Sequence, residues 1–140
     1  MRPLILIVET RPEVAEALED VVTSARYTAI VRPHVECLAD LGVTPAAIIV
    51  RIAFESVGEP QHASVARLAH RPPVVAIAWE DAEVAEAMRM KCDVVLKAPD
   101  DVGRLCDALT AVVHGSDRHT TASTELQDQT LASYPSRQAS

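Results

Sequence analysis

Five short apolar runs, separated by segments with helical periodicity, constrain the fold of this chain more than any other feature. The runs are LILIV at 4–8, TAIV at 28–31, AAIIV at 46–50, VVAIA at 74–78 and DVVL at 93–96. Each is continuous, rich in β-branched residues and bounded by polar or breaker residues, as is typical of strands buried on both faces. Aromatic residues make up only 3% of the chain, so the core has to be aliphatic. We therefore predict five strands of a buried parallel sheet.

The segments between these runs are predicted to be helices, at about 10–25, 34–41, 60–70, 81–91 and 101–113. Thr10 and Glu13 have the spacing of a capping box, Gly42 is a stop signal, and Asp100 is suited to cap the last helix. The residues predicted to face the core from these helices are Val14, Leu18, Val21, Ala25, Val65, Leu68, Ala69, Val84, Ala87, Met88, Val102, Leu105, Cys106, Leu109 and Val112.

Alternating strands and helices require crossover connections, which are right-handed and place helices on both faces of a parallel sheet. The predicted fold class is α/β, a flavodoxin-like doubly wound five-stranded sheet with strand order 2-1-3-4-5. In such sheets, ligands and active sites lie at the carboxyl ends of the strands.

Composition predicts one folded domain at 1–115 and a disordered tail at 116–140, because the tail is rich in Ser, Thr, Gln and Asp. The net charge of −7 disfavours nucleic acid as a partner. No run approaches the ~20 apolar residues of a membrane helix, so we expect no membrane association. Three cysteines without a CxxC pair favour free thiols and a cytoplasmic location. The five histidines lack ligand spacing and are expected at the surface, without a metal.

Four stretches in their order along the chain resemble the response-regulator receiver family of two-component signalling, and the resemblance covers residues 3–114. ILIVETRPEVAEALEDVV is similar to the family's first strand and helix, and TPAAIIVRIAF to its third strand. PPVVAIAWED is similar to the fourth strand, and EAMRMKCDVVLKAPDD to the fourth helix and fifth strand. The resemblance implies the receiver fold and a role in signalling.

The resemblance also implies which positions would carry the family's chemistry. A receiver transfers a phosphoryl group to its own Asp, assisted by magnesium on an acidic pair, by a Thr or Ser and by a Lys. Here the acidic pair corresponds to Glu9 and Thr10, the acceptor to Arg51 and the hydroxyl position to Ala78. The lysine position corresponds to Ala98 without a gap, or to Lys97 with a deletion of one residue. The family's aromatic switch position falls on Val94 or Val95.

Arg51 predicts a degenerate pocket that takes no phosphoryl group and no metal. A guanidinium stays charged and is not a nucleophile, and a fixed cation beside Glu9 would repel a divalent ion. We expect Arg51 and Glu9 to form an internal ion pair that replaces the metal. The alternative is that Arg51 extends to solvent from the end of its strand.

The favoured function is a phosphorylation-independent signalling module, not an enzyme and without a cofactor, that binds another protein. The partner would be a histidine kinase, a regulator or an output protein, or a second copy of the chain. Trp79 is interpreted as a lid, as ordinary packing or as an anchor for a partner. By analogy with the family, the interaction surface would include Trp79, Glu83, Glu86, Arg89, Lys91, Asp101 and Arg104.

Two alternatives remain from the sequence. The first is a small flavodoxin-like enzyme or cofactor-binding protein, which four glycines without a Gly-rich phosphate loop disfavour. The second is a working receiver that uses a non-standard acceptor such as Glu55, which lies past the end of its predicted strand.

Overall fold

Each of the five apolar runs forms a strand in the computed structural model, which describes residues 2–35, 37–54 and 60–115. All strands are parallel, in the order β2-β1-β3-β4-β5, as predicted. The strands are β1 (Leu4–Val8), β2 (Thr28–Arg32), β3 (Ala47–Arg51), β4 (Val74–Ala78) and β5 (Val94–Lys97). The expectations for Glu55 and for the tail at 116–140 lie outside the described residues.

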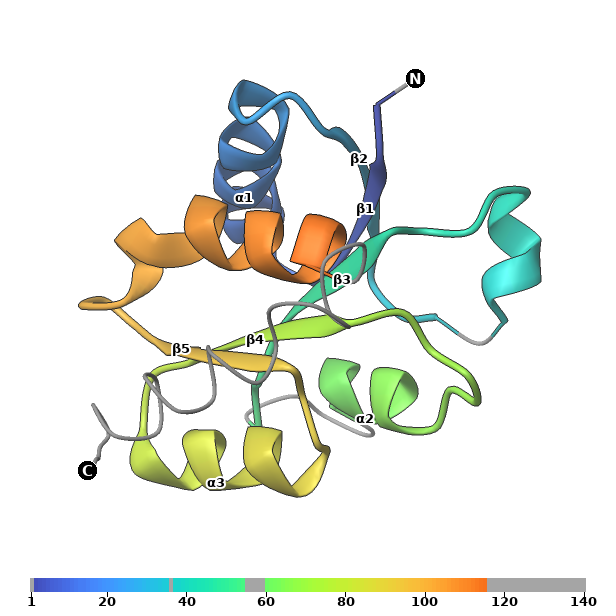
Figure 1. Cartoon of the computed structure of the whole chain (residues 1–140). Helices are drawn as coiled ribbons and strands as arrows, with labels where there is room; N and C mark the ends of the chain where they lie inside the picture. The colour runs from blue at the N-terminus through green and yellow to red at the C-terminus, as the bar shows by residue number, and fades with distance from the viewer. Residues whose placement is uncertain (1, 36, 55–59, 116–140) are drawn as a thin grey trace.

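Helices cover both faces of this sheet (Figure 1). On one face lie α1 (Pro12–Ser24) and a C-terminal helix at residues 105–115. On the other lie α2 (Gln61–Ala66) and α3 (Asp81–Arg89). None of the helices in the described ranges is long and apolar enough to cross a membrane.

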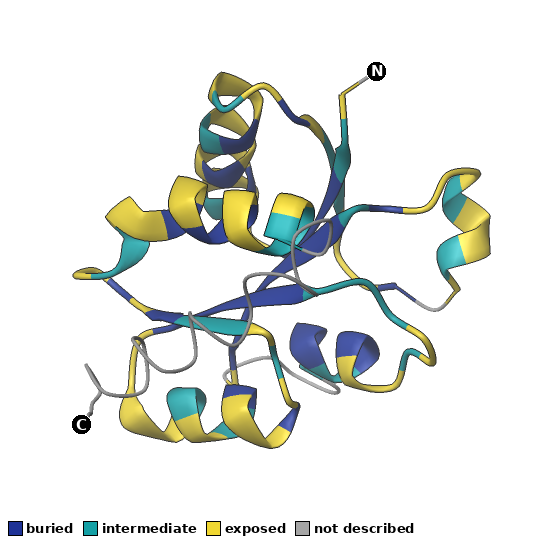
Figure 2. Ribbon diagram, viewed as in Figure 1, coloured by how far each residue is buried: buried dark blue, intermediate teal, exposed yellow. Residues whose placement is uncertain are grey.

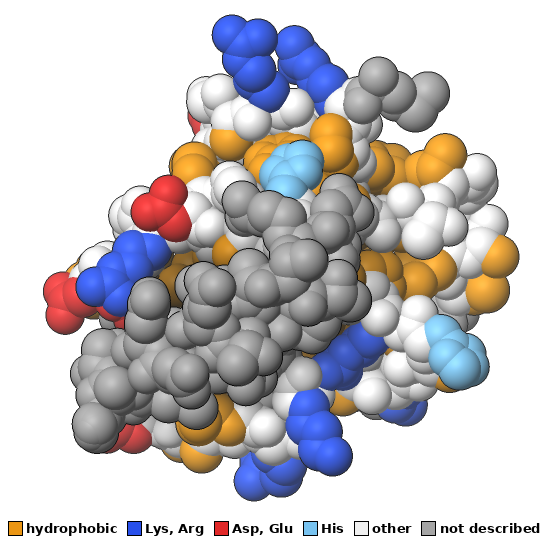
Figure 3. Space-filling model, viewed as in Figure 1, with side chains coloured by type: hydrophobic (Ala, Val, Ile, Leu, Met, Phe, Trp, Pro, Cys, Tyr) orange, Lys and Arg blue, Asp and Glu red, His pale blue; other side chains and the backbone are white. Residues whose placement is uncertain are grey.

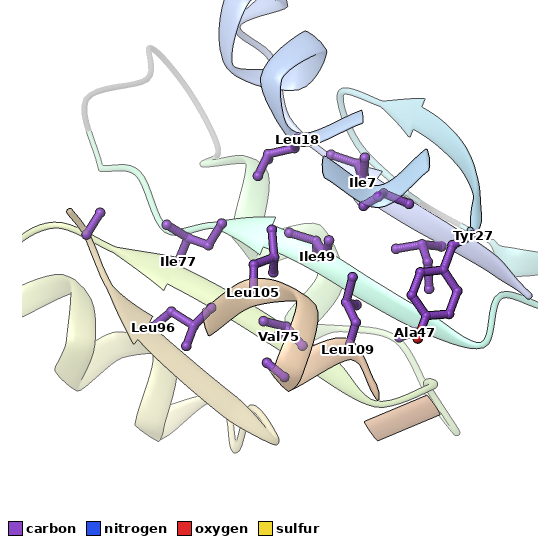
Figure 4. Packing of buried hydrophobic residues seen from close by; sticks show 14 residues of the cluster. Ile7, Leu18, Tyr27, Ala47, Ile49, Val75, Ile77, Leu96, Leu105 and Leu109 are labelled. Atoms are coloured by element: carbon purple, nitrogen blue, oxygen red, sulfur yellow. The ribbon is translucent and has the colours of Figure 1, made fainter. Parts of the chain in front are cut away.

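Strand residues alternate between two apolar clusters because successive side chains point to opposite faces. Ile7, Ile49 and Val75 pack with the C-terminal helix and α1, as Figure 4 shows. Leu6, Ile48 and their neighbours pack with α2 and α3. All residues of β3 and β4 are buried (Figure 2), so the central strands are fixed on both faces.

Register places the carboxyl ends of the central strands at the same edge of the sheet. Val8 is level with Val50, and Arg51 is level with Ile77. The residues that leave these strands therefore meet at this edge, where the sequence predicts a site.

Several predicted helix limits were wrong. The segment 34–41 contains no α-helix among its described residues, only a 3₁₀ turn, η1 (Leu38–Leu41), which ends at Gly42 with φ +78°. The backbone of Cys37 is extended, with φ −147° and ψ 123°, and this interrupts the predicted helix. Thr10 does not cap α1, which begins at Pro12, because Thr10 bonds elsewhere. Asp100 caps no helix either, since a second 3₁₀ turn, η2 (Val102–Arg104), precedes the last helix.

The helix phase also corrects some predicted core positions. Met88 and Cys106 are exposed, whereas Ala87 and Leu105 face the core as predicted. A rotation of about 100° per residue turns a residue next to a buried one toward solvent. Ala69 is exposed for another reason, because α2 ends at Ala66 and not at residue 70 as predicted. Burial of Ala108 beside Leu105 and Leu109 completes the inner face of the last helix.

Candidate functional site

An ion pair lies at the carboxyl edge of the sheet, between the ends of β1 and β3. Arg51 Nε donates to Glu9 Oε1 at 2.7 Å, and Arg51 Nη2 donates to Glu9 Oε2 at 2.9 Å. Glu9 is 2% exposed and Arg51 is 8% exposed. Two parallel charge-assisted bonds of this kind fix the geometry of both side chains. The predicted ion pair is therefore present, and Arg51 does not extend into solvent.

Gln61, at the start of α2, connects this pair to the loop after β1. Its Nε2 donates to the Arg51 carbonyl oxygen at 2.7 Å and to Glu9 Oε1 at 3.4 Å. Its Oε1 accepts from both the backbone N and the Oγ1 of Thr10, each at 2.9 Å. The side chain is fully buried. We call Glu9, Thr10, Arg51 and Gln61 the Glu9–Arg51 network.

The Glu9–Arg51 network does not fit a magnesium ion. Both Glu9 oxygens already accept hydrogen bonds from Arg51, and Oε2 also accepts the backbone N–H of Arg11 at 3.0 Å. Magnesium requires several oxygen ligands, and the described residues hold no group of three or more His, Cys, Asp or Glu placed to bind a metal. The neighbouring Ala78 supplies no hydroxyl.

Lys97 and Ala98 point to opposite faces of the sheet. The exposed Lys97 donates from Nζ to Asp81 Oδ1 at 2.7 Å, a contact that raises the pKa of Lys97 and lowers the pKa of Asp81. Ala98 is buried in the same apolar cluster as Ile49, and Arg51 follows Ile49 by two residues on that face. Ala98 therefore lies on the face of the Glu9–Arg51 network, and Lys97 is bound to α3 instead.

Trp79 follows β4 and lines a cleft of about 280 Å³ together with Arg11, Val14, Arg51 and Glu83. Its side chain is 53% exposed, and its backbone N–H donates to Glu83 Oε1 at 2.7 Å. Glu83 also completes a capping box with Glu80 at the start of α3. The cleft therefore places a large exposed aromatic side chain beside the Glu9–Arg51 network.

The other residues of the predicted interaction surface lie on α3, just after it and at η2. Glu83 and Glu86 are half-buried and have internal partners, because Glu86 contacts both Arg89 and His62. Asp101, also half-buried, accepts the backbone N–H of Lys97 at 3.0 Å. The exposed charged members of the set are Arg89, Lys91 and Arg104.

His62 was predicted at the surface, but it is 1% exposed. Its Nδ1 accepts the backbone N–H of Ala53 at 3.3 Å, and its Nε2 lies 3.4 Å from Glu86 Oε2. The ring of Phe54 meets it edge-on, with the ring centroids 5.3 Å apart. Burial lowers the pKa of His62, although Glu86 and Glu83 oppose this change. His62 thus connects the end of β3 to α3.

We expect the stability of the fold to fall in mild acid because of His62. Its pKa is lower in the folded chain than in the unfolded chain, so the unfolded state binds more protons. The contribution of neutral His62 is complete above the unfolded pKa of about 6.5 and is lost as the pH falls through the lowered pKa. Melting temperatures at about pH 7.5 and 5.5 should therefore differ more for the native chain than for His62→Gln.

The exposed His34 provides the matched control for this measurement. His34→Gln should retain the pH dependence of the native chain. If His62→Gln retains it too, His62 is not its source.

Comparison with known proteins gives a clear result only at the level of structure. No protein-family model matches the chain, and no curated protein matches it. A response regulator receiver protein from Burkholderia phymatum aligns with a TM-score of 0.65 and 20% identity, over 81% of this chain and 96% of that one.

Two further receiver domains align equally well. The receiver domain of Francisella response regulator 1452 has a TM-score of 0.67 and 11% identity, over 82% of this chain and 99% of that one. The BeF3-activated receiver domain of Klebsiella pneumoniae RstA has a TM-score of 0.65 and 17% identity, over 79% and 97%. The chain therefore has the fold of response-regulator receiver domains.

Proposed function

We propose that this chain is a phosphorylation-independent, receiver-like signalling module that acts by protein–protein interaction in a two-component or related pathway. The observation that carries the proposal is the buried bidentate pair of Arg51 with Glu9, at the edge where this fold places its functional sites. A guanidinium there supplies no nucleophile. It also neutralises the Glu9 carboxylate, which could otherwise attract a metal.

The permanent positive charge of Arg51 is expected to hold the module in one conformation, where a switchable module has two. In a switchable site, the charge changes when a ligand or covalent group arrives, and that change biases a two-state element. Here the charge of Arg51 is constant, and Gln61 holds both the Arg51 backbone and Thr10 in place. We infer that the module presents one constant surface to its partner.

The partner is proposed to be a signalling protein, either a histidine kinase, a regulator or an output protein, or else a second copy of the chain. Trp79 is the strongest candidate anchor, because it is half-exposed and borders a cleft. Exposed tryptophan and arginine side chains contribute disproportionately to binding energy at interfaces. Arg89 and Arg104 are exposed on the same candidate surface. We propose that residues 1–115 form the interacting domain, in the cytoplasm.

Treatment with acetyl phosphate tests the proposal. The full chain, incubated with acetyl phosphate and magnesium, should keep its intact mass, while a receiver with an acceptor aspartate treated in parallel gains one phosphoryl group. A species heavier by about 80 Da and sensitive to hydroxylamine would mark an acyl phosphate on a carboxylate and would contradict the proposal. Mass analysis of peptides would then identify the acceptor, Glu55 included.

A further inference from the structure

Strand β2 has one side that no other strand of the described residues covers, because it lies at the end of the sheet. Thr28 N–H and Arg32 C=O bond to the segment containing β1. Residues of a parallel strand direct their backbone groups alternately to either side, so Ala29 and Val31 direct theirs outward. The Val31 carbonyl accepts a hydrogen bond from Arg32 Nη1 at 2.9 Å, and an added strand would take the place of this side chain.

A groove of about 540 Å³ runs between this strand and α1, and its α1 wall is acidic. It is lined by Pro12, Glu13, Ala15, Glu16, Glu19 and Val31. The three carboxylates are exposed and follow each other at intervals of three residues, which places them on neighbouring turns of one helix face. Helix α1 contains no Lys or Arg to neutralise them.

We propose that this groove docks an extended basic segment of a partner protein, which adds as a strand to β2. The outward groups of Ala29 and Val31 would supply main-chain hydrogen bonds, as in other cases of strand addition. Lys or Arg at alternate positions of the segment would lie against Glu13, Glu16 and Glu19. This docking site rests on the proposed role of the chain as an interaction module, and its partner would carry an extended segment rich in Lys or Arg.

Charge selects this occupant over two others. A second copy paired antiparallel through β2, about a two-fold axis perpendicular to the sheet, would bring the two α1 helices side by side on one face, with their carboxylates repelling each other. A nucleic acid would present phosphates to the same carboxylates. A basic segment would be attracted by the carboxylates of α1 and would form main-chain hydrogen bonds with the open edge of β2.

A synthetic peptide tests the docking surface directly. The probe is a fluorescein-labelled nonapeptide in which Lys alternates with Val, and its binding to the full chain is measured by fluorescence anisotropy. Changing Glu13, Glu16 and Glu19 together to Gln should weaken binding about ten-fold or more. The control changes Asp40, Asp100 and Asp107 to Asn, which removes the same charge from exposed positions outside the groove. This control should retain most of the affinity.

Strand addition is tested separately with a peptide whose alternate backbone nitrogens are methylated. It keeps the charge but loses the donors that would pair with the edge, so it should bind at least about ten-fold more weakly. Four results would overturn the proposal: no binding at about 1 mM, equal loss in the two triple variants, full affinity of the methylated peptide, or a dimer through β2 in sedimentation. Each can arise while the acetyl phosphate result still holds, so the failure of this inference is distinguishable from failure of the proposed function.

Discussion

Replacing Arg51 with Met should lower the free energy of unfolding by about 3–5 kcal/mol, the usual loss when one partner of a buried ion pair is removed. Methionine fills much of the same volume but leaves the Glu9 carboxylate without the two bonds that Arg51 donates. The hydrogen bond from the Arg11 backbone N–H and the long contact to Gln61 would remain. Urea denaturation of the native chain and the variant measures the difference.

A double-mutant cycle separates this pairing from a general packing defect. Glu9→Gln combined with Arg51→Met should recover much of the loss, because the uncompensated charge is gone. The exposed Arg104 serves as a control, and Arg104→Met should change stability by no more than about 0.5 kcal/mol. Additive effects of the two single changes would show that Glu9 and Arg51 do not stabilise each other.

Gln61→Met should lower the free energy of unfolding by about 2–4 kcal/mol, since the buried Arg51 carbonyl and the partly buried Thr10 N–H lose their partners. The side chain of Gln61 is fully buried and serves the Thr10 N–H and the Arg51 carbonyl at once. The side chain of methionine has a similar length, but its thioether donates no hydrogen bond and accepts one only weakly. Thermal or urea denaturation gives the value.

Thr10→Val provides the graded control for Gln61. It removes only the hydroxyl contact to Gln61 Oε1 and leaves the backbone N–H contact intact. Its cost should be about 1 kcal/mol, well below that of Gln61→Met. If the two variants are equally stable, Gln61 does not organise the network.

The fold was predictable because local pattern and topology agree. Runs such as LILIV and VVAIA are buried on both faces, and only a parallel sheet between helices accommodates them. The Glu9–Arg51 pair was predictable for the same reason, because the carboxyl ends of β1 and β3 are adjacent. Both inferences depend on strand order and register, which the pattern constrains strongly.

The rest of the site depends on side-chain geometry that no periodic pattern encodes. Gln61 and His62 look like ordinary residues at the start of a helix, yet both are buried by the loops around the ends of β1 and β3. The sequence left two choices for the lysine position. In the structure Ala98, which follows β5, is buried in the apolar core, and Lys97 contacts Asp81. The predicted helix limits were wrong where short segments form 3₁₀ turns.

Amide NMR spectra with magnesium and BeF3 test the central claim most directly, because this reagent activates the RstA receiver domain that shares the fold. The chain, labelled with ¹⁵N, is titrated first with magnesium and then with BeF3. If Arg51 permanently occupies the site, the amide signals of residues 9–10, 51–53 and 78–79 should not move. Saturable shifts at these residues, increasing with magnesium, would show that the pocket still binds a metal and a phosphoryl group, and would contradict the account.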